Sequence, residues 1–187
     1  MTDRRTVVLD AAIDLVGSEG LRALTHRRVD AVAEVPAGST SNYFRTRHAL
    51  VEGVLDRLLE RDRAELAAIG EAAMPRDLGE LEGLVYGYVM HATGPDLVRT
   101  RARLAMFVEA LATPELRAGV DARRGELRGW IAVLLAGLGV EDSSTAARVL
   151  VDYLDGVILH RCTAADDQPD PREGIARMLR GIVTKPA

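Results

Sequence analysis

The 187-residue chain has one cysteine, Cys162, so a single chain can build neither a disulfide nor a cysteine-rich metal site. Histidine is also scarce, and no two histidines have the spacing of metal ligands; the four are His26, His48, His91 and His160. No apolar run is long enough to cross a membrane. Near the N-terminus, Asp10 and Asp14 interrupt the apolar residues at helical intervals, unlike in a signal peptide. We therefore expect a cytoplasmic protein with no metal, no cofactor and no membrane association.

The residue patterns of enzymes are missing as well. His160 and Cys162 are two residues apart, so on a helix their side chains point in different directions, and spacing places no acid beside them. The sequence has no glycine-rich phosphate-binding loop. We predict that the protein is not an enzyme.

Charge is unevenly distributed along the chain. The net charge of −4 at pH 7 argues against a protein that coats nucleic acid through bulk electrostatics. Residues 1–50 contain seven arginines and six acidic residues, a net charge of +1, which leaves −5 for residues 51–187. The basic side chains of the first segment could still form a local phosphate-binding surface, with the acidic remainder facing away from DNA.

Apolar residues recur at intervals of three and four, which predicts an all-α chain of about nine helices. The first helix would bury Val8, Ala12, Leu15 and Val16. A long helix that begins at Arg47 would bury Leu50, Val51, Val54, Leu55, Leu58 and Leu59. Further helices are expected at about residues 77–92, 96–112, 114–138 and 143–163. A capping-box pattern from Asp170 to Glu173 predicts the start of the last helix.

Two short helical patterns joined by a tight turn lie between Thr25 and the long helix, as in a helix-turn-helix. Thr25 is the expected N-cap of the first helix. This helix should place its apolar residues Val29, Val32 and Ala33 on one face. The second helix is expected over residues 36–44. Its inward residues should be Ala37, Thr40, Ser41 and Phe44, and its outward residues Ser39, Asn42 and Tyr43.

This segment resembles the N-terminal DNA-binding domain of the TetR family of bacterial regulators. The residues at the family's spacing are Gly20, Leu24, Thr25, Ala33, Gly38, Phe44 and Leu50. Three positions depart from it. Pro36 stands where a serine cap is usual, Ser41 replaces a tyrosine, and Arg47 stands where lysine is frequent. The resemblance implies a helix-turn-helix DNA-binding domain over residues 1–48 and a helical ligand-binding and dimerisation domain over residues 49–187.

The predicted DNA-binding residues are Thr25, Arg27, Arg28, Ala37, Ser39, Thr40, Asn42, Tyr43 and Arg47. Ser39, Thr40 and Asn42 are expected at base edges, where Asn42 could pair bidentately with adenine. The expected phosphate anchors are Thr25, Arg28, Tyr43 and Arg47. The alternative is a helical adaptor or small-molecule-binding protein that keeps the fold without binding DNA, because many amphipathic helix pairs never contact DNA.

The resemblance also implies a small-molecule inducer and a homodimer that reads a palindromic operator. The implied ligand-binding residues are Tyr86, Met90, His91, Arg103, Met106, Phe107 and Trp130. The implied dimer interface consists of Leu150, Tyr153, Leu154, Val157, Ile158, Ile175, Met178, Leu179 and Ile182. The same stripes on the last two helices could instead close the core of one chain. The resemblance thus predicts a ligand-responsive transcriptional repressor.

Overall fold

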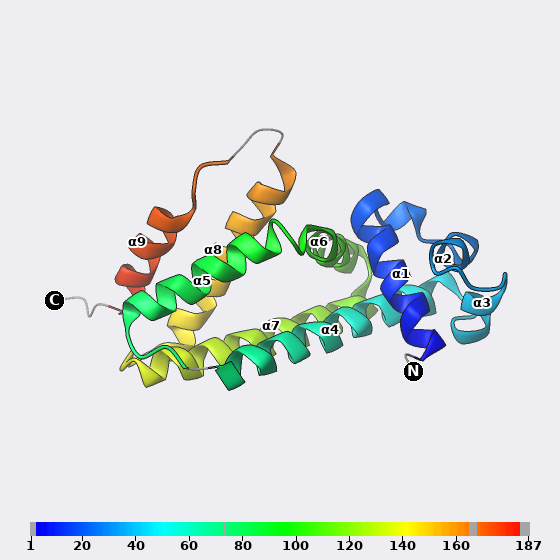
Figure 1. Cartoon of the computed structure of the whole chain (residues 1–187). Coiled ribbons are helices and arrows are strands. Elements are labelled where there is room, and N and C mark those ends of the chain that lie inside the picture. Colours follow the sequence, from blue (N-terminus) through cyan, green and yellow to red (C-terminus); the bar gives the residue numbers. More distant parts are fainter. Residues whose placement is uncertain (1–2, 73, 165–167, 184–187) are drawn as a thin grey trace. The chain divides into compact units, whose positions relative to one another are not determined.

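The structure, a computed structural model, describes residues 3–72, 74–164 and 168–183 (Figure 1). In this part of the chain every regular element is helical, which confirms the all-α expectation. The elements are α1 (Arg4–Glu19), the 3-10 turn η1 (Leu21–Ala23), α2 (His26–Val32), α3 (Ser39–Tyr43), α4 (Arg47–Ala72), α5 (Leu78–Ala92), α6 (Leu97–Ala112), α7 (Pro114–Gly137), α8 (Ser143–Thr163) and α9 (Arg172–Val183). None of the helices in the described residues is long and apolar enough to cross a membrane.

The chain divides into two compact units. Unit 1 comprises Met1–Ala68 and Leu97–Ala122, and unit 2 comprises Ile69–Asp96 and Arg123–Ala187. Unit 1 therefore contains the helix-turn-helix together with α6, which is distant from it in sequence. The functional division at residue 48 remains a prediction, because compactness alone does not assign functions to the units.

The core of unit 1 is built on α1 and α4. All four apolar residues expected to be buried on α1, and all six on α4, are buried. Helix α6 packs closely on α1 at Gly17. A Cβ atom at this position would lie only 1.9 Å from the carbonyl oxygen of Val98. The absence of a side chain at Gly17 thus allows the backbones of α1 and α6 to approach each other.

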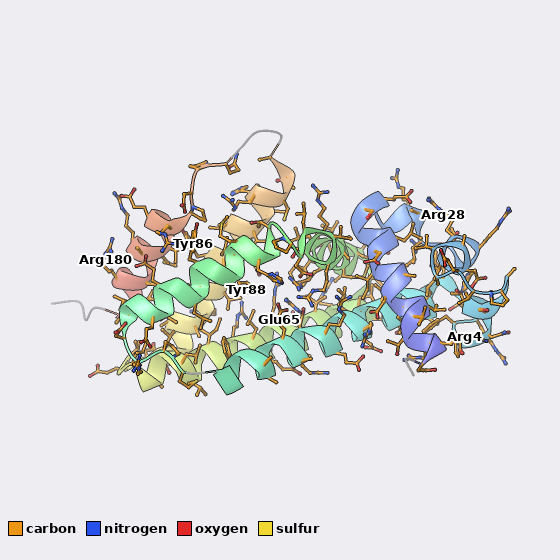
Figure 2. All side chains as sticks on the ribbon, viewed as in Figure 1. Arg4, Arg28, Glu65, Tyr86, Tyr88 and Arg180 are labelled. Atoms are coloured by element: carbon orange, nitrogen blue, oxygen red, sulfur yellow. The ribbon has the colours of Figure 1, made fainter. Side chains whose placement is uncertain are left out.

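Ion pairs connect α4 to both of these helices. On the α1 side, Arg57 donates through Nε to Asp10 Oδ1 at 2.9 Å. On the α6 side, Arg103 Nη2 lies 2.8 Å from Asp62 Oδ1, and both residues are buried. Arg99, also buried, pairs with Glu65, one α-helical turn further along α4 (Figure 2). Buried charges are tolerated where they are paired in this way.

Replacing Asp62 with leucine should lower the free energy of unfolding by about 3–5 kcal/mol, because buried Arg103 then loses the carboxylate of Asp62. The combined change of Asp62→Leu and Arg103→Met should recover most of this loss, since an apolar pair has no charge to desolvate. Chemical denaturation of the wild type, Asp62→Leu, Arg103→Met and the double variant measures the coupling. Additive losses in the double variant would contradict this account of the pair.

Unit 2 contains α5, α8 and α9, which pack on one another (Figure 1). Helix α8 begins after the N-cap Asp142, whose side chain accepts from the amide of Thr145, and it spans the predicted residues 143–163. At the start of α9, Asp170 accepts from the amide of Arg172 at 2.9 Å. Glu173 pairs with Arg177 along the exposed side of α9. Asp170 thus caps α9 through the amide of Arg172, whereas the predicted capping box uses the amide of Glu173.

Candidate nucleic-acid interface

The helix α3 is capped by a side chain from α2. The carboxylate of Asp30 accepts from the amide of Gly38 at 2.7 Å and from the amide of Thr40 at 2.8 Å. It also accepts from the Thr40 hydroxyl at 2.6 Å. Pro36, which stands in place of the expected serine, provides no such side chain. Asp30 therefore satisfies the free amides at the start of α3 and fixes this helix to α2.

Gly38 gives the turn before α3 its backbone shape. Its φ of 90° and ψ of −6° are left-handed, a conformation that glycine adopts without steric cost. This geometry directs both the Gly38 amide and the Thr40 amide toward Asp30. As a result α3 begins at Ser39, three residues later than predicted.

The hydrogen bonds to Asp30 change its ionisation. Burial by itself would raise the pKa of this carboxyl, which is only 5% exposed. The three bonds from Thr40 and Gly38 outweigh burial, with a smaller contribution from the charge of His26, and hold the pKa of Asp30 below its ordinary value. Asp30 is thus an ionised cap at neutral pH.

The lowered pKa of Asp30 predicts how stability depends on pH. Since the folded state binds this proton less tightly than the unfolded state, the contribution is complete above about pH 5 and is lost as the pH falls below about 4. Asp30→Asn removes the titrating group. The stability difference between wild type and this variant should therefore shrink on acidification, as measured by urea denaturation between pH 7 and pH 3. A constant difference would contradict an ionised cap.

The outward face of α3 differs in part from the prediction. Asn42 and Tyr43 are exposed as expected, and Tyr43 is 42% exposed. Ser39 is half-buried and donates to the carbonyl of Pro36 at 2.6 Å. Thr40 is completely buried on Asp30, as its predicted inward position required, so it supports α3 and cannot reach a base edge.

Three expectations for the inward faces of α2 and α3 were wrong. Ala37 and Ser41 are exposed, because α3 starts at Ser39 and is only five residues long. Val32, at the end of α2, is 47% exposed. The short helices bury only Val29, Asp30, Thr40 and the following Phe44. Ala37, a predicted DNA-binding residue, is accessible on the turn.

An open hollow of about 490 Å³ lies along α2 and is lined by Thr25, Arg27, Arg28, Ala31 and Val32. Thr25 caps α2, as predicted, by accepting from the amide of Arg28 at 3.4 Å. The Arg28 guanidinium donates to both oxygens of Glu19 at 2.6 and 2.7 Å. This pair is exposed, so a phosphate would have to compete with Glu19 for Arg28. Arg27 is exposed beside it.

The end of α3 is fixed by Phe44 and its neighbours. Phe44 is buried, and its carbonyl oxygen lies 2.6 Å from His26 Nε2. Thr46 then caps α4 by accepting from the amide of Ala49 at 3.1 Å, as predicted. Arg47 is exposed, and its Nη2 donates to the carbonyl of Leu21 at 3.1 Å. The predicted anchor Arg47 is therefore positioned by η1.

The candidate ligand-binding residues belong to both units. Arg103, Met106 and Phe107 lie in unit 1, where Arg103 and Met106 are buried. In unit 2, the guanidinium carbon of Arg172 lies 3.9 Å from the centroid of the Tyr86 ring, and the Tyr86 hydroxyl lies 3.4 Å from Asp170 Oδ2. The other unit 2 members are Met90, His91 and Trp130. Met90 and His91 are exposed, and Trp130 is half-buried.

The candidate dimer-interface residues fall into two groups. Five are buried within the single chain: Leu150, Leu154, Ile158, Ile175 and Leu179. Tyr153, Val157, Met178 and Ile182 are half-buried. The buried group therefore contributes to the core of unit 2, and only the second group has accessible area for another chain.

Similarity to known proteins agrees with this architecture. Residues 76–185 match the family described as tetracyclin repressor-like, C-terminal domain. A solved member of the TetR family from Streptomyces coelicolor A3 is 30% identical, with a TM-score of 0.74 over 98% of this chain and 100% of that chain. The multidrug binding protein EbrR, solved with ethidium, is 28% identical, with a TM-score of 0.77 over 98% and 100% of the two chains. No curated protein matches the chain.

A helix-turn-helix followed by helices of this arrangement defines a transcriptional-regulator fold. The match of residues 76–185 and the relative from Streptomyces coelicolor A3 place the chain in the TetR family. The protein is thus a TetR-family regulator by fold and by sequence.

Proposed function

We propose that the protein is a homodimeric, sequence-specific DNA-binding repressor, not an enzyme, and that a small-molecule inducer releases it from a palindromic operator. The observation that supports this most is the construction of α3. Asp30 and Phe44 fix its two ends, while Asn42 and Tyr43 remain exposed between them. A rigid short helix with exposed polar side chains is what readout of a major groove requires.

Within this proposal the residues have separate tasks. Asn42, with Ser39 beside it, is assigned to base edges, because amide and hydroxyl groups can discriminate between bases. Arg27, Arg47 and Tyr43 are assigned to phosphates, which set register without reading sequence. Thr25 and Thr40 stabilise the framework, and Ala37 lines the turn. Arg28 shares its charge with Glu19, to which its Nη2 donates.

The proposed homodimer uses the half-buried residues of α8 and α9, namely Tyr153, Val157, Met178 and Ile182. A twofold dimer would present its two copies of α3 to major grooves about 34–36 Å apart. An inducer can release DNA only if it binds the non-binding arrangement more tightly.

Aromatic cations are suitable first probes for the inducer. EbrR has been solved with ethidium and with proflavin. A cationic ligand would be attracted by carboxylates. In this chain the carboxylates of Asp62 and Glu65 already pair with Arg103 and Arg99, so a cation would have to compete with these arginines. Fluorescence titration with ethidium, followed by gel shift with and without the dye, tests whether binding is coupled to release.

A genomic-fragment binding selection with purified protein tests the proposal directly. Enrichment of a palindrome would support a dimeric DNA reader, and the enriched site then serves for gel-shift titrations. No enrichment by a folded dimer, prepared free of co-purified small molecules, would favour the adaptor alternative.

Substitutions on the enriched site separate base contacts from phosphate contacts. Asn42→Ala should reduce affinity for the operator while leaving non-specific binding nearly unchanged, a loss of about 1–3 kcal/mol per half-site. Arg47→Ala should weaken binding to all sequences alike and reduce the salt slope by about 1 per subunit. Gel shifts on operator and scrambled DNA at two salt concentrations measure both effects. An Arg47→Ala loss confined to one operator sequence would overturn its assignment.

A further inference from the structure

The N-terminal end of α1 lies against the end of the helix that is proposed to read DNA. The guanidinium carbon of Arg5 lies 5.2 Å from the centroid of the Phe44 ring, and Phe44 directly follows α3. Arg5 is exposed, as is Arg4 beside it (Figure 2). Among residues 1–9 these two arginines outweigh one acidic residue, Asp3. A basic site therefore flanks the C-terminal end of α3.

The Phe44 ring is a fixed platform for Arg5. The ring packs on Gly53 of α4, where a Cβ atom would lie 2.5 Å from Phe44 Cε1. The backbone carbonyl oxygen of Phe44 lies 2.6 Å from His26 Nε2. Phe44 itself is only 5% exposed, so its position is set by the core of unit 1. The guanidinium above it is thus located relative to α3 and not left at the end of a free side chain.

The cation–π contact with Phe44 uses the charge of the guanidinium and requires no hydrogen-bond acceptor. The N–H donors of Arg5 are therefore not used up by acceptors on the ring. Arg28 differs, because its Nη2 already donates to both carboxylate oxygens of Glu19. Arg57 also differs, because it is shared between Asp10 and Glu60. Arg5 is therefore better prepared for an incoming phosphate than either of these arginines.

We infer that Arg5 is a DNA phosphate contact, held on the Phe44 ring, that extends the interface beyond the segment that α3 itself covers. This inference rests on the proposed function. A planar guanidinium can bond a phosphate with two parallel N–H groups. Arg5 lies on α1 and not on the helix proposed to enter the groove, so we assign it to the DNA backbone. Arg5 fixes the position of the C-terminal end of α3, as Arg27 and Arg47 do elsewhere in unit 1.

The test compares Arg5→Gln and Arg5→Lys with a charge-matched control, Arg177→Gln. Arg177 lies on the exposed side of α9. Arg177→Gln changes the net charge by the same amount as Arg5→Gln. Gel-shift affinities are measured on the enriched operator between 50 and 200 mM salt. Two lost phosphate contacts per dimer should reduce the salt slope by about 1.8. When salt rises from 50 to 200 mM, the factor by which affinity falls should therefore be about tenfold smaller for Arg5→Gln than for wild type. Arg5→Lys should restore most of the slope, and Arg177→Gln should behave as wild type.

The outcomes separate this inference from the proposed function. If wild-type protein binds no DNA, the proposed function fails and Arg5 loses its assigned partner with it. If wild type binds and Arg5→Gln keeps the wild-type slope, only the Arg5 contact is refuted. A melting temperature more than about 5 °C lower in Arg5→Gln would show a structural role and would equally overturn the contact.

Discussion

Replacing Asp30 with alanine should strongly weaken operator binding, although this residue is buried and does not face DNA. The change removes three hydrogen bonds to an ionised carboxylate and leaves the amides of Gly38 and Thr40 without their acceptor. Bonds to charged groups contribute about 1.5–3 kcal/mol each, so the helix-turn-helix should lose at least about 4 kcal/mol. Affinity for the operator should fall by more than about 100-fold. Gel shift and thermal unfolding monitored by circular dichroism measure the two effects.

Thr40→Val is the matched control for Asp30→Ala. It removes the hydroxyl bond and keeps both amide bonds to Asp30, so it should cost only about 1.5–3 kcal/mol. Because Thr40 is buried, the variant should also prefer the same operator sequence as wild type. A changed sequence preference would return Thr40 to the base-reading residues. Wild-type DNA binding by Asp30→Ala would refute the cap.

Replacing Gly17 with alanine should have the second large effect. The new Cβ atom would meet the backbone carbonyl of Val98 at 1.9 Å, and backbone cannot rotate away as a side chain can. Helix α6 would have to move off α1, which disrupts the core that both helices share. Overpacking of this kind costs about 1–3 kcal/mol, and we expect the upper end or more, because the clash is with backbone. Urea denaturation measures the loss.

Gly83→Ala gives the opposite expectation from the same chemical change. Gly83 lies within α5 and is exposed, and a Cβ atom at this position would meet no atom within 4 Å outside the backbone of its own helix. Alanine should stabilise this helix by about 0.5–1 kcal/mol. Equal effects at Gly17 and Gly83 would show that helix propensity, and not the approach of α6 to α1, determines the result at Gly17.

Local features of the fold could be predicted from the sequence. The apolar stripes of α1 and α4 are buried as expected, because a repeat of three and four residues fixes a face of a helix regardless of its partner. The caps Thr25 and Thr46 act on amides only three residues away. Helix α8 spans the predicted residues because the N-cap Asp142 precedes it and a proline-containing segment follows it. Short-range chemistry is sufficient for such features.

Features that depend on tertiary approach could not be predicted in this way. Asp30 caps an amide ten residues further along the chain, and no local pattern specifies that distance. The one sequence signal for this cap was the acidic residue Asp30 itself, which directly follows the apolar residue Val29 of α2. The contact of Gly17 with Val98 and the pairing of Arg28 with Glu19 likewise require the positions of separate helices. The candidate DNA-binding set remains a prediction, and it omitted Asp30, the side chain that supports α3.

Hydroxyl-radical footprinting of the protein on its enriched operator tests the central claim most directly. A dimer that presents two copies of α3 should protect two patches on one face of the duplex, centred about 34–36 Å apart and related by the symmetry of the palindrome. Asp30→Ala should remove both patches, because each copy of α3 depends on its own cap. A single asymmetric patch, or protection that persists in Asp30→Ala, would contradict a dimeric reader built on the Asp30-capped helix.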